Sequence, residues 1–398
     1  MAVGALIGAY QEDDSGGLRA LVPLSGRTLI EYQASCAAAA GAAPIVVVVE
    51  RVPQALQDAF ERLRLEGIGV FPVSDVHEAV SRFEAGAAIM MIGDGIAPTA
   101  ELVARLAEEP EPVVVTIPDD SAHESYERID AQSRWAGVAI VDAHLLGSTA
   151  TMLGDWDLQS TLLRRAIQEG AHRLPAEEVG AEPILVERGA DLDHFQRRLL
   201  EASRGARNDW ISRFLLPPVE EFATAQLMET QVRPRWLNWA AVALTAGAAL
   251  CFLKGWLGAG LGLLILSTPL DLVATRLGAL RLRPLPVRLA SRLALEPLAA
   301  AALLALSWWE MKQGHGWGTL VAGATAIAFA EAMRVEKSGF PPDTDIWLFS
   351  RRSAIFAAIP FALLGSWTPY LIVMLAYAAA SFFVVQHARH SKPELTGS

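Results

Sequence analysis

Long apolar segments alternate with charged loops along the second half of the chain. From Trp236 onward, each apolar segment approaches the length that crosses the hydrocarbon core of a bilayer. We therefore predict six membrane-spanning helices, over about residues 236–253, 256–274, 293–309, 317–333, 353–366 and 369–386. The fifth segment is the shortest and would cross only as a tilted or partly buried helix.

The loops between these segments differ in charge. Basic residues gather in alternate loops, and the three other loops carry only Lys254 and Lys312. The positive-inside tendency then predicts the orientation of a multi-pass protein, and we expect it in a bacterial-type inner (plasma) membrane. Both termini and residues 1–235 are expected in the cytoplasm.

The first half has another pattern, in which short apolar runs alternate with amphipathic stretches of helical length. The runs include AVGALIGAY (2–10), PIVVVVE (44–50), AAIMMIGD (87–94) and PVVVTIPD (112–119). Strands that alternate with helices predict an α/β domain with a mainly parallel sheet covered on both faces. We expect this domain over residues 1–200, a juxtamembrane amphipathic linker over 201–235, and an all-α six-span membrane domain over 236–390.

Charge separates the same two halves. Residues 1–200 hold 15 Lys and Arg against 31 Asp and Glu, whereas the whole chain has a net charge of -11. The acidic half is not expected to bind nucleic acid through its overall field. Cys36 and Cys251 fall one in each half, which gives neither a metal-ligand spacing nor a disulfide framework.

One candidate binding residue lies at the end of a predicted strand. Parallel sheets bind ligands beyond the carboxyl ends of their strands, and Asp94 follows the strand AAIMMI. Asp94 is therefore a candidate to hold a divalent metal on the phosphates of a nucleotide. A turn aspartate that stabilises its own loop is the alternative.

A second candidate site lies in the membrane half. Thr268, Asp271 and Thr275 share one helix face near the cytoplasmic end of the second span. They indicate a polar pocket for a cation or a phosphate; alternatively, Asp271 pairs with Arg276 or Arg281 as an interfacial anchor. In the same span, Gly258 and Gly262 suit close helix packing, either within the chain or across a homodimer of membrane helices.

Four segments carry a resemblance to a known fusion of domains. They are LRALVPLSGRTLIEY (18–32), IGDG (92–95), RWAGVAIVDAHLL (134–146) and NDWISRFLLPPVEEFATAQL…RPRWLNW (208–239). Their order resembles a sugar-nucleotidyltransferase-like domain joined to a six-helix CDP-alcohol phosphotransferase (phosphatidyltransferase) domain. The nearest type comprises the bifunctional enzymes that form CDP-inositol and then an inositol phosphodiester. In that family the last segment is a helix that lies on the membrane before the first span.

The resemblance implies a phosphotransferase signature, D-x-x-D-G-x-x-A-R followed by two further aspartates, whose carboxylates hold two Mg²⁺ ions on the CDP diphosphate. Aligned on Arg276, the second aspartate is Asp271, while Thr268 and Thr275 replace the first aspartate and the alanine. No aspartate occurs between residues 272 and 342. Because one carboxylate cannot hold two divalent ions on a pyrophosphate, we expect a degenerate site. Asp271 remains its metal position, and Thr268, Thr275 and Arg276 its substrate-binding positions.

In the first domain the resemblance places GAYQEDDSGGLR (8–19) at the family's glycine-rich loop. It implies that Arg19, at the position of the family's lysine, binds phosphate, and that Asp94 binds Mg²⁺. The second metal carboxylate falls near residues 187–191, where Glu187 or Gly189 aligns. The acidic residues of the loop would repel a triphosphate unless a metal intervenes.

These features leave the function open between two classes. One is a transferase of phospholipid or envelope phospho-alcohol metabolism, which binds a nucleotide or a CDP-alcohol at the bilayer. The other is a non-catalytic membrane scaffold or binding subunit of an envelope biosynthesis complex. In a variant of the first, Asp343 and Asp345 build a replacement phosphate site with Arg351 and Arg352.

Overall fold

The computed structural model divides into two compact units, and each is described by itself. The first unit comprises residues 1–202 with 280–283, and the second residues 203–279 with 284–398. The described residues are 3–14, 16–109, 112–152, 157–179, 182–187, 191–203, 209–228, 230, 232–282, 290–337 and 346–390.

A seven-stranded sheet forms the centre of the first unit. Its order is β10 (His172–Pro175), β8 (Val113–Pro118), β9 (Ser133–Asp142), β6 (Ala88–Ile92), β1 (Val3–Gly8), β4 (Ile45–Val48) and β5 (Val70–Val73). Strands β6, β1, β4 and β5 are parallel, whereas β9 is antiparallel to both of its neighbours. The prediction of a mainly parallel α/β sheet is therefore confirmed, with one reversed strand.

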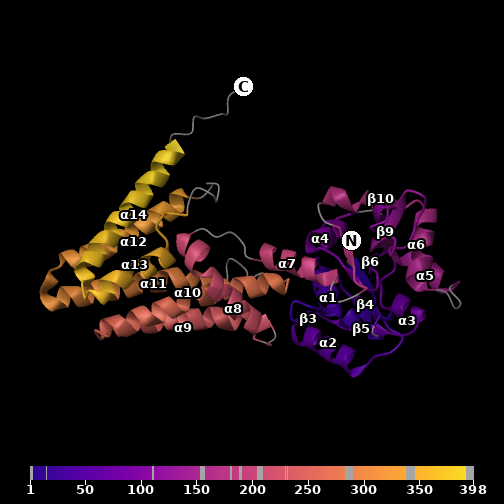
Figure 1. The fold of residues 1–398 in the computed structure, drawn as a ribbon, viewed down its shortest axis with the longest axis horizontal. Helices are drawn as coiled ribbons and strands as arrows, with labels where there is room; N and C mark the ends of the chain where they lie inside the picture. The colour runs from indigo at the N-terminus through magenta and orange to yellow at the C-terminus, as the bar shows by residue number, and fades with distance from the viewer. Residues whose placement is uncertain are drawn as a thin grey trace. The chain divides into compact units, whose positions relative to one another are not determined.

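Helices cover both faces of this sheet (Figure 1). The first face packs against α1 (Leu29–Ala39), α2 (Gln54–Leu65), α4 (Ala100–Ala107) and α7 (Leu192–Ala202). The second face packs against α3 (Val76–Ser81), α5 (Ala143–Ala150) and α6 (Leu158–Gln168). Successive side chains of a strand point to opposite faces of the sheet. In β1, Ile7 therefore packs in the core of the first face and Leu6 in the core of the second face. This double burial explains why the strands read as continuous apolar runs.

Helix α1 begins at a capping box that the sequence T-L-I-E encodes. The side chain of Glu31 accepts hydrogen bonds from the backbone and hydroxyl of Thr28, at 2.9 and 2.8 Å, and from two nitrogens of Arg62 at 2.8 and 2.9 Å. Burial acts to raise the pKa of the Glu31 carboxyl, but the hydrogen bonds from Arg62 and Thr28 outweigh it and lower that pKa. Glu31 therefore ties the start of α1 to α2.

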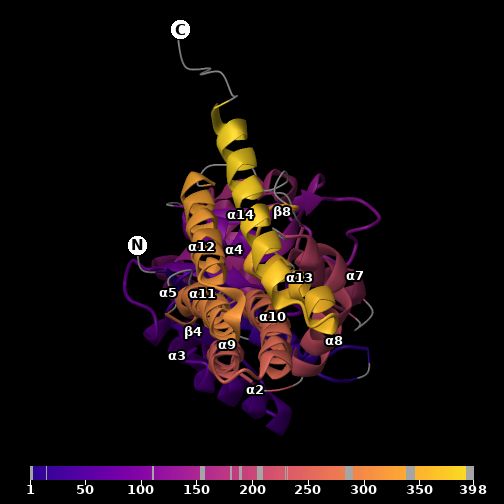
Figure 2. The ribbon, with the colours of Figure 1, turned by 90° about the vertical axis from the view of Figure 1, so that its left-hand side faces the viewer.

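The second unit is helical. Its elements are the π-helix η4 (Ile211–Leu215) and the α-helices α8 (Pro217–Met228), α9 (Pro234–Leu253), α10 (Leu257–Leu280), α11 (Ala290–Glu310), α12 (Gly318–Glu336), α13 (Arg351–Leu363) and α14 (Trp367–His390). Helix α11 packs along α9, and α12 packs along α14 (Figure 2). The two remaining strand pairs, β2 (Pro23–Leu24) with β3 (Arg27–Thr28) and β7 (Ile96–Ala97) with β11 (Ile184–Leu185), belong to the first unit.

Within the described residues, five helices are long and apolar enough to cross a membrane: α9, α10, α11 with the π-helix η5 (Met311–His315) that follows it, α12 and α14. Less than half of each apolar window is buried inside the unit, so most of these side chains face outward, as a lipid environment requires. The predicted fifth span is the exception. Helix α13 has 13 residues, or about 20 Å at 1.5 Å per residue, which is short of a hydrocarbon core about 30 Å thick.

The glycines of α10 do not all serve the same purpose. Gly258 and Gly262 are exposed, and a Cβ added at either would meet no atom within 4 Å among the described residues. The expectation that this pair packs within the chain is therefore wrong, and the homodimer stays a prediction. Gly260 makes the close contact instead, since a Cβ there would lie 2.7 Å from the ring of Phe252.

Candidate functional site

Asp94 lies at the carboxyl edge of the first unit's sheet, in the turn that follows β6. Its Oδ2 accepts hydrogen bonds from the backbone N–H groups of Tyr10 and Gln11, both at 2.6 Å. These two residues follow β1, which is parallel to β6, so both strands deliver their loops to the same edge. Burial raises the pKa of Asp94, although the two backbone donors oppose the shift.

Two buried glutamines hold the Asp94 turn from opposite sides. Gln33 of α1 donates to the carbonyl oxygen of Ile96 at 2.6 Å, and Gln159 of α6 accepts from the backbone N–H of Asp94 at 3.2 Å. The amide of Gln159 also donates to the carbonyl of Ile92 at 2.9 Å. Neither glutamine carries a motif that marks it in the sequence, and both were missed.

Arg19 lies against the same turn. Its Nη1 donates to Oε1 of Gln11 at 2.9 Å and its Nε to the carbonyl of Glu12 at 3.2 Å. A Cβ added at Gly95 would lie 3.0 Å from the Arg19 side chain, so the glycine allows the arginine to approach. The structure thus brings together Arg19 and Asp94, the two residues that the sequence proposed for nucleotide phosphate and metal.

The donor set at this edge fits a Mg²⁺ ion that is shared with phosphate oxygens. Oδ1 of Asp94 is buried and has no hydrogen-bond partner among the described residues. Mg²⁺ usually takes one or two carboxylates together with the phosphates of its substrate. Glu187, the expected second carboxylate, follows Val186, whose N–H donates to the carbonyl of Gly95 at 2.8 Å. Gly189 lies outside the described residues.

In the second unit, Asp271 is enclosed by two arginines of α13. Its Oδ2 accepts from Nη2 of Arg351 at 2.6 Å and from Nη2 of Arg352 at 2.8 Å. Arg352 also donates to Oδ2 of Asp209 at 2.8 Å. The exposed fraction of the side chain is 14% for Asp271, 5% for Arg351 and 3% for Asp209. We call Asp209, Asp271, Arg351 and Arg352 the ionic cluster.

The expected pairing of Asp271 with Arg276 is wrong. Arg276 is buried and pairs instead with Glu220 of α8 at 3.3 Å, while its Nε donates to Oγ of Ser203 at 3.3 Å. Five residues of a helix turn through about 500°, because each residue adds about 100°. Asp271 and Arg276 therefore occupy different faces of α10 and do not pair with each other.

The two threonines of the predicted pocket bond to their own helix. Pro269 has no N–H and leaves the carbonyl of Ile265 without its helical donor. The hydroxyl of Thr268 supplies that bond at 2.7 Å, and the hydroxyl of Thr275 donates to the carbonyl of Asp271 at 2.8 Å. Thr268 is fully buried, so its hydroxyl stabilises a proline-containing stretch of α10.

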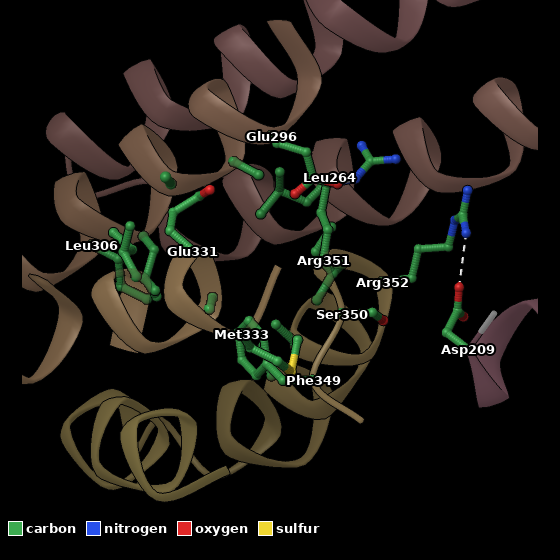
Figure 3. Close-up of a pocket in the computed structure, with 18 of the residues that line it drawn as sticks. Asp209, Leu264, Glu296, Leu306, Glu331, Met333, Phe349, Ser350, Arg351 and Arg352 are labelled. Atoms are coloured by element: carbon green, nitrogen blue, oxygen red, sulfur yellow. Dashed lines mark hydrogen bonds and ion pairs between the residues drawn. The ribbon is translucent and has the colours of Figure 1, made fainter. Parts of the chain in front are cut away.

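A cavity of about 390 Å³ lies beside the ionic cluster, within the second unit. Its lining includes the charged residues Asp209, Glu296, Arg351 and Arg352 and the apolar residues Leu264, Leu306 and Met333 (Figure 3). Figure 3 shows Arg352 reaching Asp209, while Arg351 extends toward Glu296. The sequence gave Arg351 and Arg352 a role as phosphate ligands with Asp343 and Asp345, which lie outside the described residues. Asp209 was missed, because nothing local in the sequence connects it to α13.

A comparison with protein families gives a match, and it covers most of the first unit. Residues 15–207 match the family model of the MobA-like NTP transferase domain. The chain therefore combines a nucleotidyltransferase-like domain with an apolar helical region that holds five candidate membrane spans.

Among solved structures, a nucleotidyl transferase from Methanothermobacter thermautotrophicus (Mth528) is similar to this chain at 16% sequence identity. The match covers 50% of this chain and 99% of the other, with a TM-score of 0.37. A comparison with curated proteins finds no match.

Proposed function

We propose that this protein is an integral membrane member of the CDP-alcohol phosphotransferase family, fused to a nucleotidyltransferase-like domain, whose phosphotransfer site has lost its metal chemistry. It acts in phospholipid or envelope phospho-alcohol metabolism by binding rather than by transferring a phospho-alcohol. The observation that carries this proposal is that one oxygen of Asp271 accepts hydrogen bonds from both Arg351 and Arg352.

The charges around Asp271 support this reading. Oδ1 of Asp271, like Oδ1 of Asp94, is buried without a hydrogen-bond partner among the described residues. A divalent ion at Asp271, however, would be repelled by the two guanidinium groups that bind Oδ2. Arg351 and Arg352 therefore neutralise the charge of Asp271, whereas metal ions neutralise the corresponding aspartate in the family.

The first unit supports a separate role in nucleotide binding. Oδ1 of Asp94 would hold a Mg²⁺ ion shared with a nucleotide, and the ion would neutralise charge on the phosphates. Arg19 would bind a phosphate oxygen through nitrogens that now contact Gln11 and Glu12. We place this unit in the cytoplasm because basic residues gather in alternate loops, and we propose that the helices lie in a bacterial-type inner membrane.

The test is release of CMP from CDP-alcohols by the purified full-length protein with Mg²⁺. We expect release at the level of a protein-free blank across a panel of acceptor alcohols, while an active CDP-alcohol phosphotransferase assayed in parallel gives product. Mg²⁺-dependent release that disappears in Asp271→Asn would refute the proposal, because that result requires Asp271 to serve as a metal ligand.

A further inference from the structure

The cavity of the second unit runs along much of helix α11. Glu296 and Leu306 both line it, and their ten-residue separation corresponds to about 15 Å of helix. Phe252 and Trp367, whose rings lie 6.3 Å apart, line it as well. The cavity therefore has a charged part near the start of α11 and an apolar part near its end.

The charged part offers hydrogen-bond donors without acceptors. Among the described residues, Nη1 of Arg351 and Nε of Arg352 are buried and have no hydrogen-bond partner. A guanidinium group has five N–H donors and no acceptor. An unmet donor on a buried cation is costly, and a phosphate oxygen is the acceptor that the guanidinium fork matches best. The side chain of Arg351 is 95% buried, since only 5% of it is exposed.

The charge balance limits how many negative charges the ligand carries. The described carboxylates at or behind the cavity wall are Asp209, Asp271, Glu296 and Glu331, and the cations are Arg334, Lys337, Arg351 and Arg352. The described side chains at the cavity therefore carry four charges of each sign. Beside buried cations that already have carboxylate partners, one added negative charge that is well hydrogen-bonded is tolerated more easily than the several charges of a diphosphate without a metal.

The size and the apolar lining limit the rest of the ligand. A volume of about 390 Å³ lies near the lower end of the range of roughly 300–1,000 Å³ that is usual for ligand cavities. It leaves room for a small head group and one apolar chain, but not for two complete acyl chains. Leu264, Leu303 and Ile355 supply an apolar wall for such a chain.

We propose that this cavity binds, without a metal ion, a singly charged phosphodiester head group that carries one apolar chain. Arg351 and Arg352 hold the phosphate oxygens, and the chain lies between α11, α13 and α14. This inference rests on the proposed function, because it requires that Asp271 binds arginines rather than metals.

The experiment uses full-length protein in phosphatidylcholine nanodiscs. The probe is lysophosphatidylglycerol that carries a photoreactive diazirine in its acyl chain. After irradiation in EDTA, peptides are analysed by mass spectrometry. We expect cross-links on the cavity wall around Leu306 and Trp367, an unchanged yield in Mg²⁺, and competition by unlabelled lysophosphatidylglycerol. Dimethyl phosphate, a free phosphodiester, should compete at least about 100-fold less well, because each buried methylene adds roughly 0.8 kcal/mol of apolar transfer. If dimethyl phosphate competed as well as unlabelled lysophosphatidylglycerol at the same concentration, the assignment of the ligand as a lipid would be overturned.

A matched pair of substitutions on α11 separates the cavity from the outer surface of the helix. Ala300 lines the cavity, whereas its neighbour Ala301 is exposed. Ala300→Phe should fill the cavity and lower the yield at least 10-fold, and Ala301→Phe should leave it unchanged. Equal yields in the two variants would overturn the inference. Neither residue belongs to the ionic cluster, so this pair remains informative if arginine variants fail to fold.

The head group is tested by a second pair. Arg351→Gln should weaken competition by unlabelled lipid about 10- to 100-fold, the usual effect of losing a hydrogen bond to a charged group. Arg334→Gln removes a half-exposed charge at the cavity and should change the competition by unlabelled lipid less than about 3-fold.

Two results would overturn the metal-free site for a singly charged ligand. One is a cross-link that needs Mg²⁺, and the other is a cross-link that CDP-diacylglycerol blocks in EDTA as well as unlabelled lysophosphatidylglycerol does. CMP release is scored separately, so the proposed function can stand when this inference fails.

Discussion

Replacing Asp271 by alanine should destabilise the helical unit around α10 and α13 by about 3–5 kcal/mol, as expected when one partner is removed from a buried ion pair. The substitution leaves Arg351 with Glu296, 3.8 Å from its Nε, as its remaining carboxylate among the described residues. Arg352 keeps Asp209. Hydrogen exchange of the full-length protein in detergent, analysed peptide by peptide, should show faster opening of α10 and α13.

A double substitution distinguishes an ion pair from a general loss of packing. Asp271→Ala with Arg351→Met removes the unpaired cation together with its carboxylate. It should therefore recover roughly 0.5–3 kcal/mol relative to the sum of the two single effects. Arg389→Met is the control, because its partner Glu336 lies at a more exposed position, and this variant should stay within about 1 kcal/mol of the parent. Unchanged exchange in Asp271→Ala would show that the arginines do not depend on this carboxylate.

Gly137→Ala should destabilise the first unit by about 2–5 kcal/mol and displace the turn that carries Asp94. Gly137 has φ +85°, and a Cβ there would lie 2.3 Å from the side chain of Ile96, which is itself buried. A left-handed backbone costs a residue with a side chain about 1–2 kcal/mol, and overpacking adds about 1–3 kcal/mol. The carbonyl of Gly137 also accepts from the N–H of Gly93 at 2.7 Å, next to Asp94.

The matched control for Gly137 is Gly170→Ala. Gly170 has φ +84°, but a Cβ there would meet no described atom within 4 Å. This variant should show the backbone cost alone, so the difference between the two variants measures the clash with Ile96. Hydrogen exchange of peptides from β6 and β9 gives both values. Equal effects would contradict the view that close packing at Gly137 positions the Asp94 turn.

The sequence patterns that predicted the fold correctly are apolar runs whose residues are buried along a whole strand or helix. The apolar runs of β1, β4 and β6 are buried on both faces, so each reads as a strand without knowledge of its neighbours. Helix α13 shows the limit of this reasoning. Its residues Ile355 and Ala358 are apolar because they pack inside the helical unit, and hydropathy alone does not separate such a helix from a membrane span.

The candidate site was predictable only in part, because its contacts join distant segments. Asp94 and Arg19 could be placed, since strand ends and a loop motif mark them. The partners of Asp271 could not, because Arg351 is 80 residues and Arg352 is 81 residues away along the chain. Arg276 and its partner Glu220 are likewise 56 residues apart along the chain, so the sequence does not reveal that pairing.

The central claim, that Asp271 binds arginines in place of metals, is tested most directly by Mn²⁺ binding to the full-length protein. Electron paramagnetic resonance counts the bound ions in the parent, in Asp271→Asn and in Asp94→Asn. We predict the same number of bound Mn²⁺ ions in Asp271→Asn as in the parent, with any bound ion depending on Asp94. Loss of a bound ion in Asp271→Asn that Asp94→Asn retains would contradict this account and restore a metal site in the helical unit.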